Sequence, residues 1–498
     1  MSFYYRQLEQ KFEKIAHLEN ILGILNWDIA CNIKSGSEES RSQEIVSLSK
    51  ILHQLLTSNE IKKLITLSQQ EEHQLDAWQK ANLREIILKV KDEEIVPEEL
   101  QKNLILSTTK AEIIWRQARK NNDYELFKPY LAKVIEYKQQ LAKIRSQAFG
   151  LSLYDSLLDQ FSRGMTTVKI KKIFDFLKTQ LPVLIKKIVT KKIFSKNDHN
   201  NRIKMNIAKQ KDLNNQIMSI IGFDFNYGRL DESTHPFCGG TPFDIRLTTR
   251  YDENNLFDSF FATVHEVGHA LYEQNLPLKY KNQPVGKALD LQFYESQSLL
   301  MEKQVAKSKE FLVFLANYLQ QKLNLNDATL KADNLYLQAN KVQPSFIRVD
   351  ADEVTYCLHI ILRFEIEELL INGQLSVDEL PNVWNQKMKD YLGIVPSSFS
   401  EGCLQDVHWP SGSFGYFPSY ANGMIISAMV MKKYSDLYPD YKNDFLKGDF
   451  TKLNHYLNQN FRNFGSFYNS KDLLLQATGE SEINPHTFLT YLENKYLN

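Results

Sequence analysis

The sequence has no excess of either charge and very few cysteines. Lysine plus arginine and aspartate plus glutamate number 60 each in 498 residues, so the formal net charge at pH 7 is zero. No overall field attracts nucleic acid or an anionic membrane, and we expect neither as a partner. The four cysteines, Cys31, Cys238, Cys357 and Cys403, contain no CxxC pair. This scatter argues against a cysteine metal cluster and is typical of a reducing cytoplasm.

Long hydrophobic runs are also missing. The nearest candidate, residues 423–431, is much shorter than the roughly 18 apolar residues that a membrane helix needs. The first ten residues contain neither the apolar core nor the cleavage site of a secretory signal. We therefore expect a cytoplasmic protein without a membrane span. A hydrophobic content of 43% with 24% charged residues is ordinary for a globular chain and allows a sizeable core.

What the sequence does contain, above all in its first two hundred residues, is helical periodicity. Apolar and charged positions alternate at three- and four-residue steps, without a fixed repeat. The expected helices span residues 3–25, 37–57, 60–68, 71–95, 97–120 and 123–149. Between residues 223 and 252 the pattern changes to short strands broken by turns. The sequence therefore predicts a mainly α fold with a small β-ribbon.

The most informative stretch is His265-Glu266-Val267-Gly268-His269. Apolar residues on both sides fall at helical spacing and predict a helix over about residues 258–274. Two histidines four positions apart share one helix face, so both can bind one metal ion at roughly 2.0–2.1 Å. Glu266 lies beside them, where it can take a proton from a metal-activated water. The motif therefore predicts a catalytic metal site.

A catalytic zinc site needs a third protein ligand. Glu273 lies on the same helix as the two histidines. Ligands at i, i+4 and i+8 of one helix extend over about 12 Å, so Glu273 cannot bind the same ion as both histidines. After the Pro and Gly residues of segment 277–286, a second helix is expected to begin at Asp290 as N-cap. Its inward face carries Glu295, which we predict as the third ligand. Glu302, two turns further along that face, ranks second.

These motifs resemble those of the M32 family of metallocarboxypeptidases, the thermostable carboxypeptidase Taq type. Further segments similar to family motifs follow one another along nearly the whole chain: Trp27-Asp28, His235-Pro236-Phe237, 244–248, 347–352 and 402–409. The resemblance implies a large helical zincin-like (gluzincin) fold with a long substrate cleft, formed as one unit over residues 1–498. Residues 1–200 would form one side of the cleft, and residues 201–498 would form the catalytic part.

The family also implies a function. A metal-dependent carboxypeptidase releases single amino acids from peptides with a free C-terminus. The resemblance implies one divalent ion per chain, Zn²⁺ first, with Co²⁺ or Mn²⁺ as substitutes. Its ligands would be His265, His269 and Glu295, and Glu266 would act as general base. A homodimer is implied by the family alone.

A carboxypeptidase must recognise a free α-carboxylate, and the planar fork of an arginine suits that task. Arg348 is our candidate, at the start of a helix that we expect over residues 346–371. Its place in a segment that matches a family motif favours a role in the active site. The alternative is a surface pair with Asp352 one helical turn away, which would contribute only a few tenths of a kcal/mol.

Two other segments supply candidates for the substrate cleft. The family motifs place His235 and Arg246 along the cleft, near its far end, although Arg246 could instead pair with Asp244. A side chain that donates a hydrogen bond to the oxyanion of the tetrahedral intermediate is expected within residues 402–420. The candidates there, which the sequence does not rank, are His408, Tyr416 and Tyr420.

The chain departs from the family pattern at two positions near the third ligand. Tyr294 occupies a position where the family commonly has histidine, and Leu299 one where arginine is usual. Neither change removes a ligand, but altered surroundings of a metal typically change affinity or activity by about 10–100-fold. Two alternatives stay open: a helical gluzincin oligoendopeptidase, which would cleave peptides blocked at the C-terminus, and a weakly active binding or scaffold protein.

Overall fold

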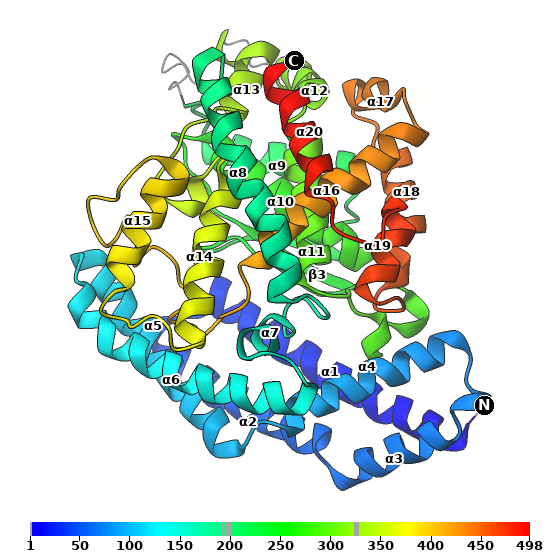
Figure 1. The fold of residues 1–498 in the computed structure, drawn as a ribbon. Coiled ribbons are helices and arrows are strands. Elements are labelled where there is room, and N and C mark those ends of the chain that lie inside the picture. The colour runs from blue at the N-terminus through cyan, green and yellow to red at the C-terminus, as the bar shows by residue number, and fades with distance from the viewer. Residues whose placement is uncertain (1, 192, 195–201, 323–327) are drawn as a thin grey trace.

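The computed structural model describes residues 2–191, 193–194, 202–322 and 328–498. Helices dominate it, which confirms the mainly α prediction (Figure 1). The first eight helices are α1 (Phe3–Cys31), α2 (Glu38–Leu56), α3 (Asn59–Gln70), α4 (Ala77–Glu94), α5 (Glu98–Asn121), α6 (Tyr124–Phe149), α7 (Leu153–Leu158) and α8 (Thr167–Lys191). Helices α2, α3, α5 and α6 agree with the predicted ranges within two residues. Helix α1 continues six residues beyond the predicted end at residue 25, and α4 begins six residues after the predicted start at residue 71. The predicted boundary between the two parts, at residues 200 and 201, lies outside the described residues.

The second half of the chain contains the sheet and the remaining helices. The elements before residue 307 are α9 (Ile207–Ile221), β1 (Gly228–Glu232), β2 (Cys238–Thr241), β3 (Asp244–Thr249), α10 (Leu256–Gln274), α11 (Leu291–Leu299) and the π-helix η6 (Leu300–Ala306). The later helices are α12 (Lys309–Lys322), α13 (Ala332–Ala339), α14 (Tyr356–Ile371), α15 (Leu380–Leu392), α16 (Pro418–Leu437), α17 (Tyr441–Lys447), α18 (Thr451–Asn460), α19 (Ser470–Thr478) and α20 (Pro485–Leu497). Within the described part, no helix is long and apolar enough to cross a membrane.

Side-chain caps explain why several helices begin where they do. Asp76 and Gln79 form a reciprocal capping box at the start of α4. Asp123 accepts a hydrogen bond from the Leu126 amide and caps α6. Asp290 caps α11 in the same way, accepting from the Phe293 amide at 3.2 Å, as predicted. Local sequence signals therefore determine these boundaries.

The predicted β-ribbon is a three-stranded mixed sheet with strand order β1-β3-β2. β1 runs parallel to the central strand β3, with Gly228 opposite Ile245, and β2 runs antiparallel to it. Ile245 and Leu247 are fully buried on β3, and helix α10 packs against this strand. The sheet thereby supports the helix that carries the two histidines.

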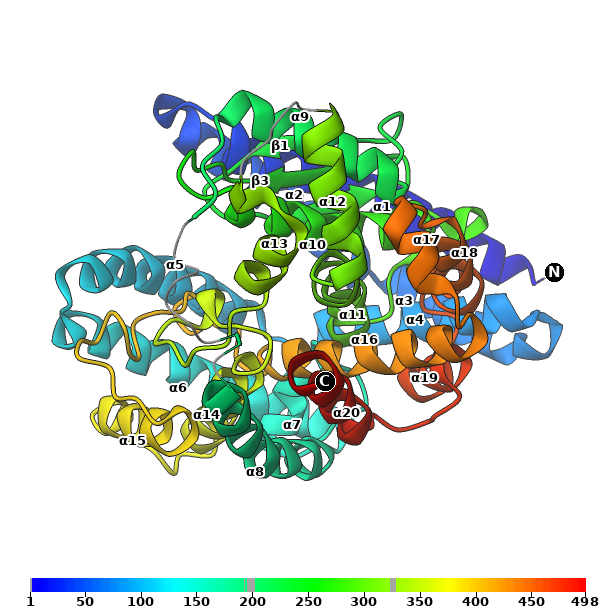
Figure 2. The same ribbon diagram turned by 90° about the horizontal axis from the view of Figure 1, so that it is seen from above.

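The buried apolar residues described form a large core, a smaller one and a third group of three residues, Ala81, Tyr280 and Val285. The small core lies among helices α1 to α4, from Tyr5 to Val90, in the lower part of Figure 1. The large core runs from Leu100 in α5 to Tyr496 in α20. In its middle, α11 packs between α10 and α16, as the view from above also shows (Figure 2).

Two glycines allow α11 to approach its neighbours at backbone distance. A Cβ atom on Gly268 of α10 would lie 2.4 Å from the Gln297 carbonyl oxygen and 2.5 Å from the Ser298 Cα atom. A Cβ atom on Gly423 of α16 would lie 2.9 Å from the Glu295 Cβ atom. Direct backbone contact therefore fixes how far Glu295 lies from the histidines of α10.

The predicted start of the helix at residues 346–371 is wrong. Helix α14 begins at Tyr356, and Arg348 lies in a short 3-10 turn, Arg348–Asp350. The carboxylate of Asp352 accepts hydrogen bonds from the Val354 and Thr355 amides at 2.9 and 3.0 Å. Because an aspartate that binds the next amides favours a turn over a helix, Asp352 interrupts the pattern. Arg348 and Asp352 therefore do not form a helical surface pair.

Candidate metal centre and peptide-binding site

Three side chains from two helices converge as predicted. The Nε2 atoms of His265 and His269 lie 3.6 and 3.7 Å from the Oε2 atom of Glu295. Ligand atoms of these three residues all lie within 4.8 Å of one another, and no other group of this kind occurs among the described residues. Tetrahedral zinc with bonds of about 2.0–2.2 Å holds its ligands about 3.3–3.6 Å apart. The three side chains therefore fit one divalent ion with little movement.

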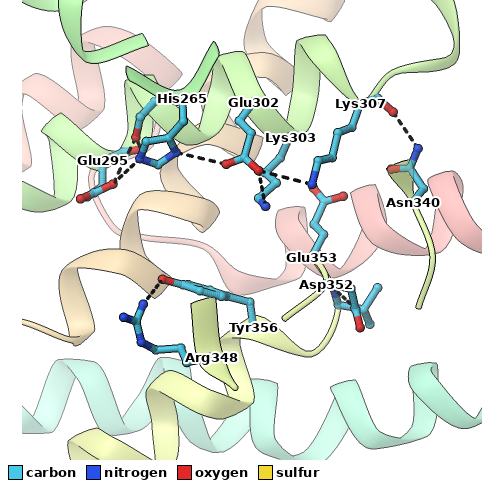
Figure 3. Close-up of polar contacts among 12 residues, drawn as sticks. His265, Glu295, Glu302, Lys303, Lys307, Asn340, Arg348, Asp352, Glu353 and Tyr356 are labelled. Atoms are coloured by element: carbon cyan, nitrogen blue, oxygen red, sulfur yellow. Dashed lines mark hydrogen bonds and ion pairs between the residues drawn. The ribbon is translucent and has the colours of Figure 1, made fainter. Parts of the chain in front are cut away.

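His265 is oriented by a carboxylate behind it. Its Nδ1 atom lies 3.1 Å from the Glu302 Oε2 atom and donates to it, which leaves Nε2 free to bind an ion (Figure 3). A carboxylate that binds the second ring nitrogen is typical of metal-bound histidines.

Glu302 comes from the π-helix rather than from α11. The sequence predicts an ordinary helix from Asp290 through Glu302, but the α-helical pattern ends at Leu299 and the wider π-turns follow. Such π-segments occur often at functional sites, where they change the direction of side chains. Glu302, our second candidate for the third ligand, here contacts His265 instead of joining the group of three.

His269 is buried, with 5% of the residue exposed. Its ring stacks on Tyr294, with centroids 4.1 Å apart and planes 19° apart. Burial and the neighbouring His265 hold the pKa of His269 well below its usual range, so the imidazole is neutral, as a metal ligand must be. The departure at Tyr294 therefore places a phenol ring against the second histidine.

Glu266 has the environment of a general base. The side chain is buried, with 6% of the residue exposed, and it lines the same cavity as His265. Burial raises the pKa of Glu266 to about 7, although the charge of His265 opposes this shift. A carboxylate with a pKa near neutrality can both accept and return a proton during one catalytic cycle.

Arg348 is held by a buried ion network. Its Nε atom donates to Asp406 at 2.9 Å, and Nη1 donates to the Tyr356 hydroxyl at 3.0 Å. Its amide donates to the Gln405 side chain at 2.8 Å. Arg363 binds the other Asp406 oxygen, with its Nε atom at 2.6 Å. Among the described residues no hydrogen-bond acceptor reaches the Nη2 atom of Arg348, so this nitrogen is available to a ligand.

One cavity connects these groups. It has a volume of about 1350 Å³, and its walls include His265, Glu266, Arg348, Tyr356 and Tyr420. All of its lining residues come from the second part of the chain, between residues 202 and 496. Of the three residues that can hold an ion, His265 lines this cavity, so it faces the same space as the arginine that can bind a carboxylate.

Comparison with known proteins identifies the family. A model of the family described as carboxypeptidase Taq (M32) metallopeptidase matches residues 7–496. The chain is 33% identical to carboxypeptidase 1 of Bacillus subtilis and 32% identical to thermostable carboxypeptidase 1 of Thermus thermophilus, in each case over 99% of this chain and 98% of the relative.

Solved structures agree. The structure titled Trypanosoma cruzi metallocarboxypeptidase 1 superposes with a TM-score of 0.95 at 35% identity, and 99% of each chain is covered. The M32 carboxypeptidase of Deinococcus radiodurans gives a TM-score of 0.94 at 28% identity, again with 99% coverage of both chains. The chain belongs to the M32 family. It is a metal-dependent carboxypeptidase, and the resemblance predicted from its motifs is confirmed.

The structure separates the three M32 oxyanion candidates. Only Tyr420 among them lines the cavity. Its hydroxyl lies 3.3 Å from the His408 Nε2 atom, and burial raises the pKa of the phenol well above its usual range, so Tyr420 keeps its proton. His408 is buried behind it, where burial and Arg348 lower its pKa to about 3. Tyr416 packs edge-on against Phe161.

The two candidates from the M32 sheet motifs lie outside the lining of this cavity. His235 is exposed in the loop before β2. Arg246 pairs with Asp244, with its Nη2 atom at 2.9 Å from the carboxylate, and lies 4.3 Å above the Trp27 ring. This is the pairing that sequence reasoning offered as the alternative to a substrate role.

Several M32 site residues were missed by sequence reasoning. Lys303, Lys307 and Glu353 line the same cavity as His265, and Arg363 completes the network around Asp406. The lysines carried a usable signal, since they follow Glu302 on the segment that supplies the third ligand. Arg363 carried none, because its partner lies 43 residues further along the chain.

Proposed function

We propose that His265, His269 and Glu295 hold one divalent ion, Zn²⁺ first and Co²⁺ or Mn²⁺ as substitutes, and that Glu266 is the general base of the carboxypeptidase reaction. The observation that carries this assignment is the convergence of the two imidazoles and the Glu295 carboxylate, with His265 lining the same cavity as Glu266 and Arg348. A bound ion supplies Lewis-acid chemistry: it polarises the last peptide carbonyl and acidifies water.

The protein's own side chains then divide the remaining work. Glu266 takes a proton from the attacking water and transfers it to the leaving amine, for which a pKa near 7 is well suited. Arg348 binds the terminal carboxylate through its Nη2 atom, so that only the last peptide bond is in register. Tyr420 donates a hydrogen bond from its hydroxyl to the carbonyl oxygen as negative charge develops there. Products are one free amino acid and a shortened peptide.

Other parts of the assignment rest on the family or on composition. We propose a homodimer from family membership, and a cytoplasmic location because the four cysteines are free thiols. The even charge balance supports peptides, rather than nucleic acid, as partners. Residues 1–200 as one side of the cleft, and His235, Arg246, His408 and Tyr416 as substrate contacts, stay predictions.

The test combines one substrate pair with one variant. Wild-type protein should release the last residue of an unblocked peptide and leave the same peptide with a C-terminal amide intact, as followed by mass spectrometry. Glu266→Gln should keep the metal content of wild type and lose about 100-fold or more in kcat, because the base is gone. Cleavage of the amidated peptide would point to an oligoendopeptidase, and full activity of Glu266→Gln would refute the mechanism.

A further inference from the structure

A row of buried charges continues from the metal site along one wall of the cavity (Figure 3). Glu302, whose Oε2 atom binds His265, receives two lysines on its Oε1 atom. The Nζ atom of Lys303 lies at 2.6 Å and that of Lys307 at 3.3 Å. The carboxylate of Glu302 therefore contacts two ammonium groups and one imidazole.

The next carboxylate along the wall is already matched. Glu353 pairs with Lys495 at 2.7 Å. It also accepts hydrogen bonds from the hydroxyls of Tyr491 at 2.8 Å and Tyr496 at 3.0 Å. The row thus contains three lysines and two glutamates, and among the described residues one ammonium group beside Glu302 has no carboxylate of its own.

The charges of Lys303 and Lys307 affect each other, as expected for two ammonium groups that share one carboxylate. Burial and the charge of Lys303 lower the pKa of Lys307 to about 8. The two ammonium groups repel each other in a poorly solvated wall, where an anion placed between them would stabilise both. Both side chains are only 12–14% exposed, and both line the cavity.

The Arg348 side of the cavity shows the same imbalance. Arg348 and Arg363 share the single carboxylate of Asp406. His408 adds no charge there, since burial and Arg348 lower its pKa to about 3. Two cations therefore share one carboxylate at Arg348, and two share one carboxylate at the lysine pair.

Three aspartates also line the cavity, and none of them forms an ion pair with Lys303 or Lys307 in the described structure. Asp352 is engaged by the Val354 and Thr355 amides. Asp258 accepts from the Asn255 side chain at 2.6 Å, and Asp350 is solvent-exposed. Neither Asp352 nor Asp258 forms an ion pair with Lys303 or Lys307 in the described structure.

We propose that Lys303 and Lys307 form a second carboxylate subsite, so that the enzyme prefers peptides whose last residue is glutamate or aspartate. This inference rests on the proposed function. Arg348 binds the α-carboxylate, and the lysine pair binds the side-chain carboxylate of the same residue. Arg348 and the lysine pair in one cavity match the two carboxylates of an acidic C-terminal residue, with charge-assisted hydrogen bonds at both ends.

The substrate test compares two N-blocked dipeptides, Ala-Glu and Ala-Gln, which differ in charge and hardly in size. Wild-type enzyme should show a kcat/KM ratio of about ten or more in favour of Ala-Glu, because a buried charged hydrogen bond discriminates by at least this factor. Raising the ionic strength should reduce the ratio. A wild-type ratio of one or less would overturn the proposal.

The variants locate the effect. Lys303→Met and Lys307→Met should each bring the ratio close to one. Lys309→Met is the matched control, since Lys309 is exposed on α12 and lines a different cavity. Its ratio should equal that of wild type. A ratio that persists in both lysine variants would overturn the proposal.

Binding of free amino acids supplies a readout besides turnover. By calorimetry, L-glutamate should bind wild-type protein about tenfold more tightly than L-glutamine, and Lys307→Met should remove the difference. If no peptide is cleaved but glutamate is still preferred, the proposed function fails and the subsite survives. If neutral peptides are cleaved and glutamate is not preferred, the subsite alone fails.

Discussion

Replacing Glu302 by glutamine should weaken metal binding without abolishing it. The carboxylate accepts the Nδ1 proton of His265 at 3.1 Å, and it is anchored by Lys303 and Lys307. Glutamine keeps the size of the side chain but removes its charge, so His265 becomes a weaker and less well oriented ligand. Glu295 is still present to complete the site.

The size of the effect follows from the geometry. Loss of a carboxylate behind a metal-bound histidine typically costs about 10–100-fold in affinity, or roughly 1.4–2.7 kcal/mol. Removal of a direct ligand costs much more. We therefore expect Glu302→Gln to bind one ion per chain with a Kd raised about 10–100-fold, and Glu295→Gln to retain no stoichiometric ion after dialysis.

The assay is competition of zinc between the protein and a chelator of known affinity, at fixed pH and with apo-protein as the starting state. Glu310→Gln is the control, because Glu310 lies on α12, pairs with Lys442 at 3.2 Å and lines a different cavity. Its zinc affinity should equal that of wild type. An unchanged affinity in Glu302→Gln, or complete loss of stoichiometric zinc, would refute the assignment of Glu302 as a support rather than a ligand.

Three further predictions follow from the fold and the site. Gly268→Ala should lower stability by about 1–3 kcal/mol and reduce zinc content, because its Cβ atom would meet the backbone of α11; thermal unfolding and metal analysis test this, and a more stable variant would contradict it. Tyr420→Phe should lower kcat about 100-fold and change KM little, because the protonated phenol donates its hydrogen bond in the transition state. A rise in KM as large as the fall in kcat would contradict an oxyanion role. Burial alone would raise the pKa of Asp406, but its two arginine partners hold it well below the usual range, so its contribution to stability is complete above the unfolded pKa of about 3.9 and is lost as pH falls below it. The urea midpoint should therefore fall more steeply between about pH 5 and pH 3 in wild type than in Asp406→Asn, and equal slopes would contradict this.

The parts of the site that sequence reasoning predicted are those encoded by local spacing. His265 and His269 share a face because they lie four residues apart on one helix, and Asp290 marks the start of the next helix as its cap. Glu295 then points inward because of the apolar pattern around it. These features depend on neighbours a few residues away, so a single sequence contains the required information.

The parts that were missed depend on distant contacts. Arg348 was expected in a helix, but it lies in a turn and binds Asp406, which is 58 residues further along the chain. The π-helix that directs Glu302 toward His265 leaves no mark in the apolar pattern of residues 291–302. Packing decides both features, and periodicity does not report packing between segments far apart.

The close approach of α11 to both of its neighbours matters for anyone who redesigns this enzyme. With glycine at 268 and 423, bare main chain sets the spacing of the ligands, whereas adjustable side chains would tolerate error. Catalytic constellations lose function when their geometry drifts by more than about 0.5 Å. A transplant of the three ligands into another helical scaffold would consequently have to carry both glycines, and mutant libraries aimed at new specificity should spare these two codons while varying the cavity wall.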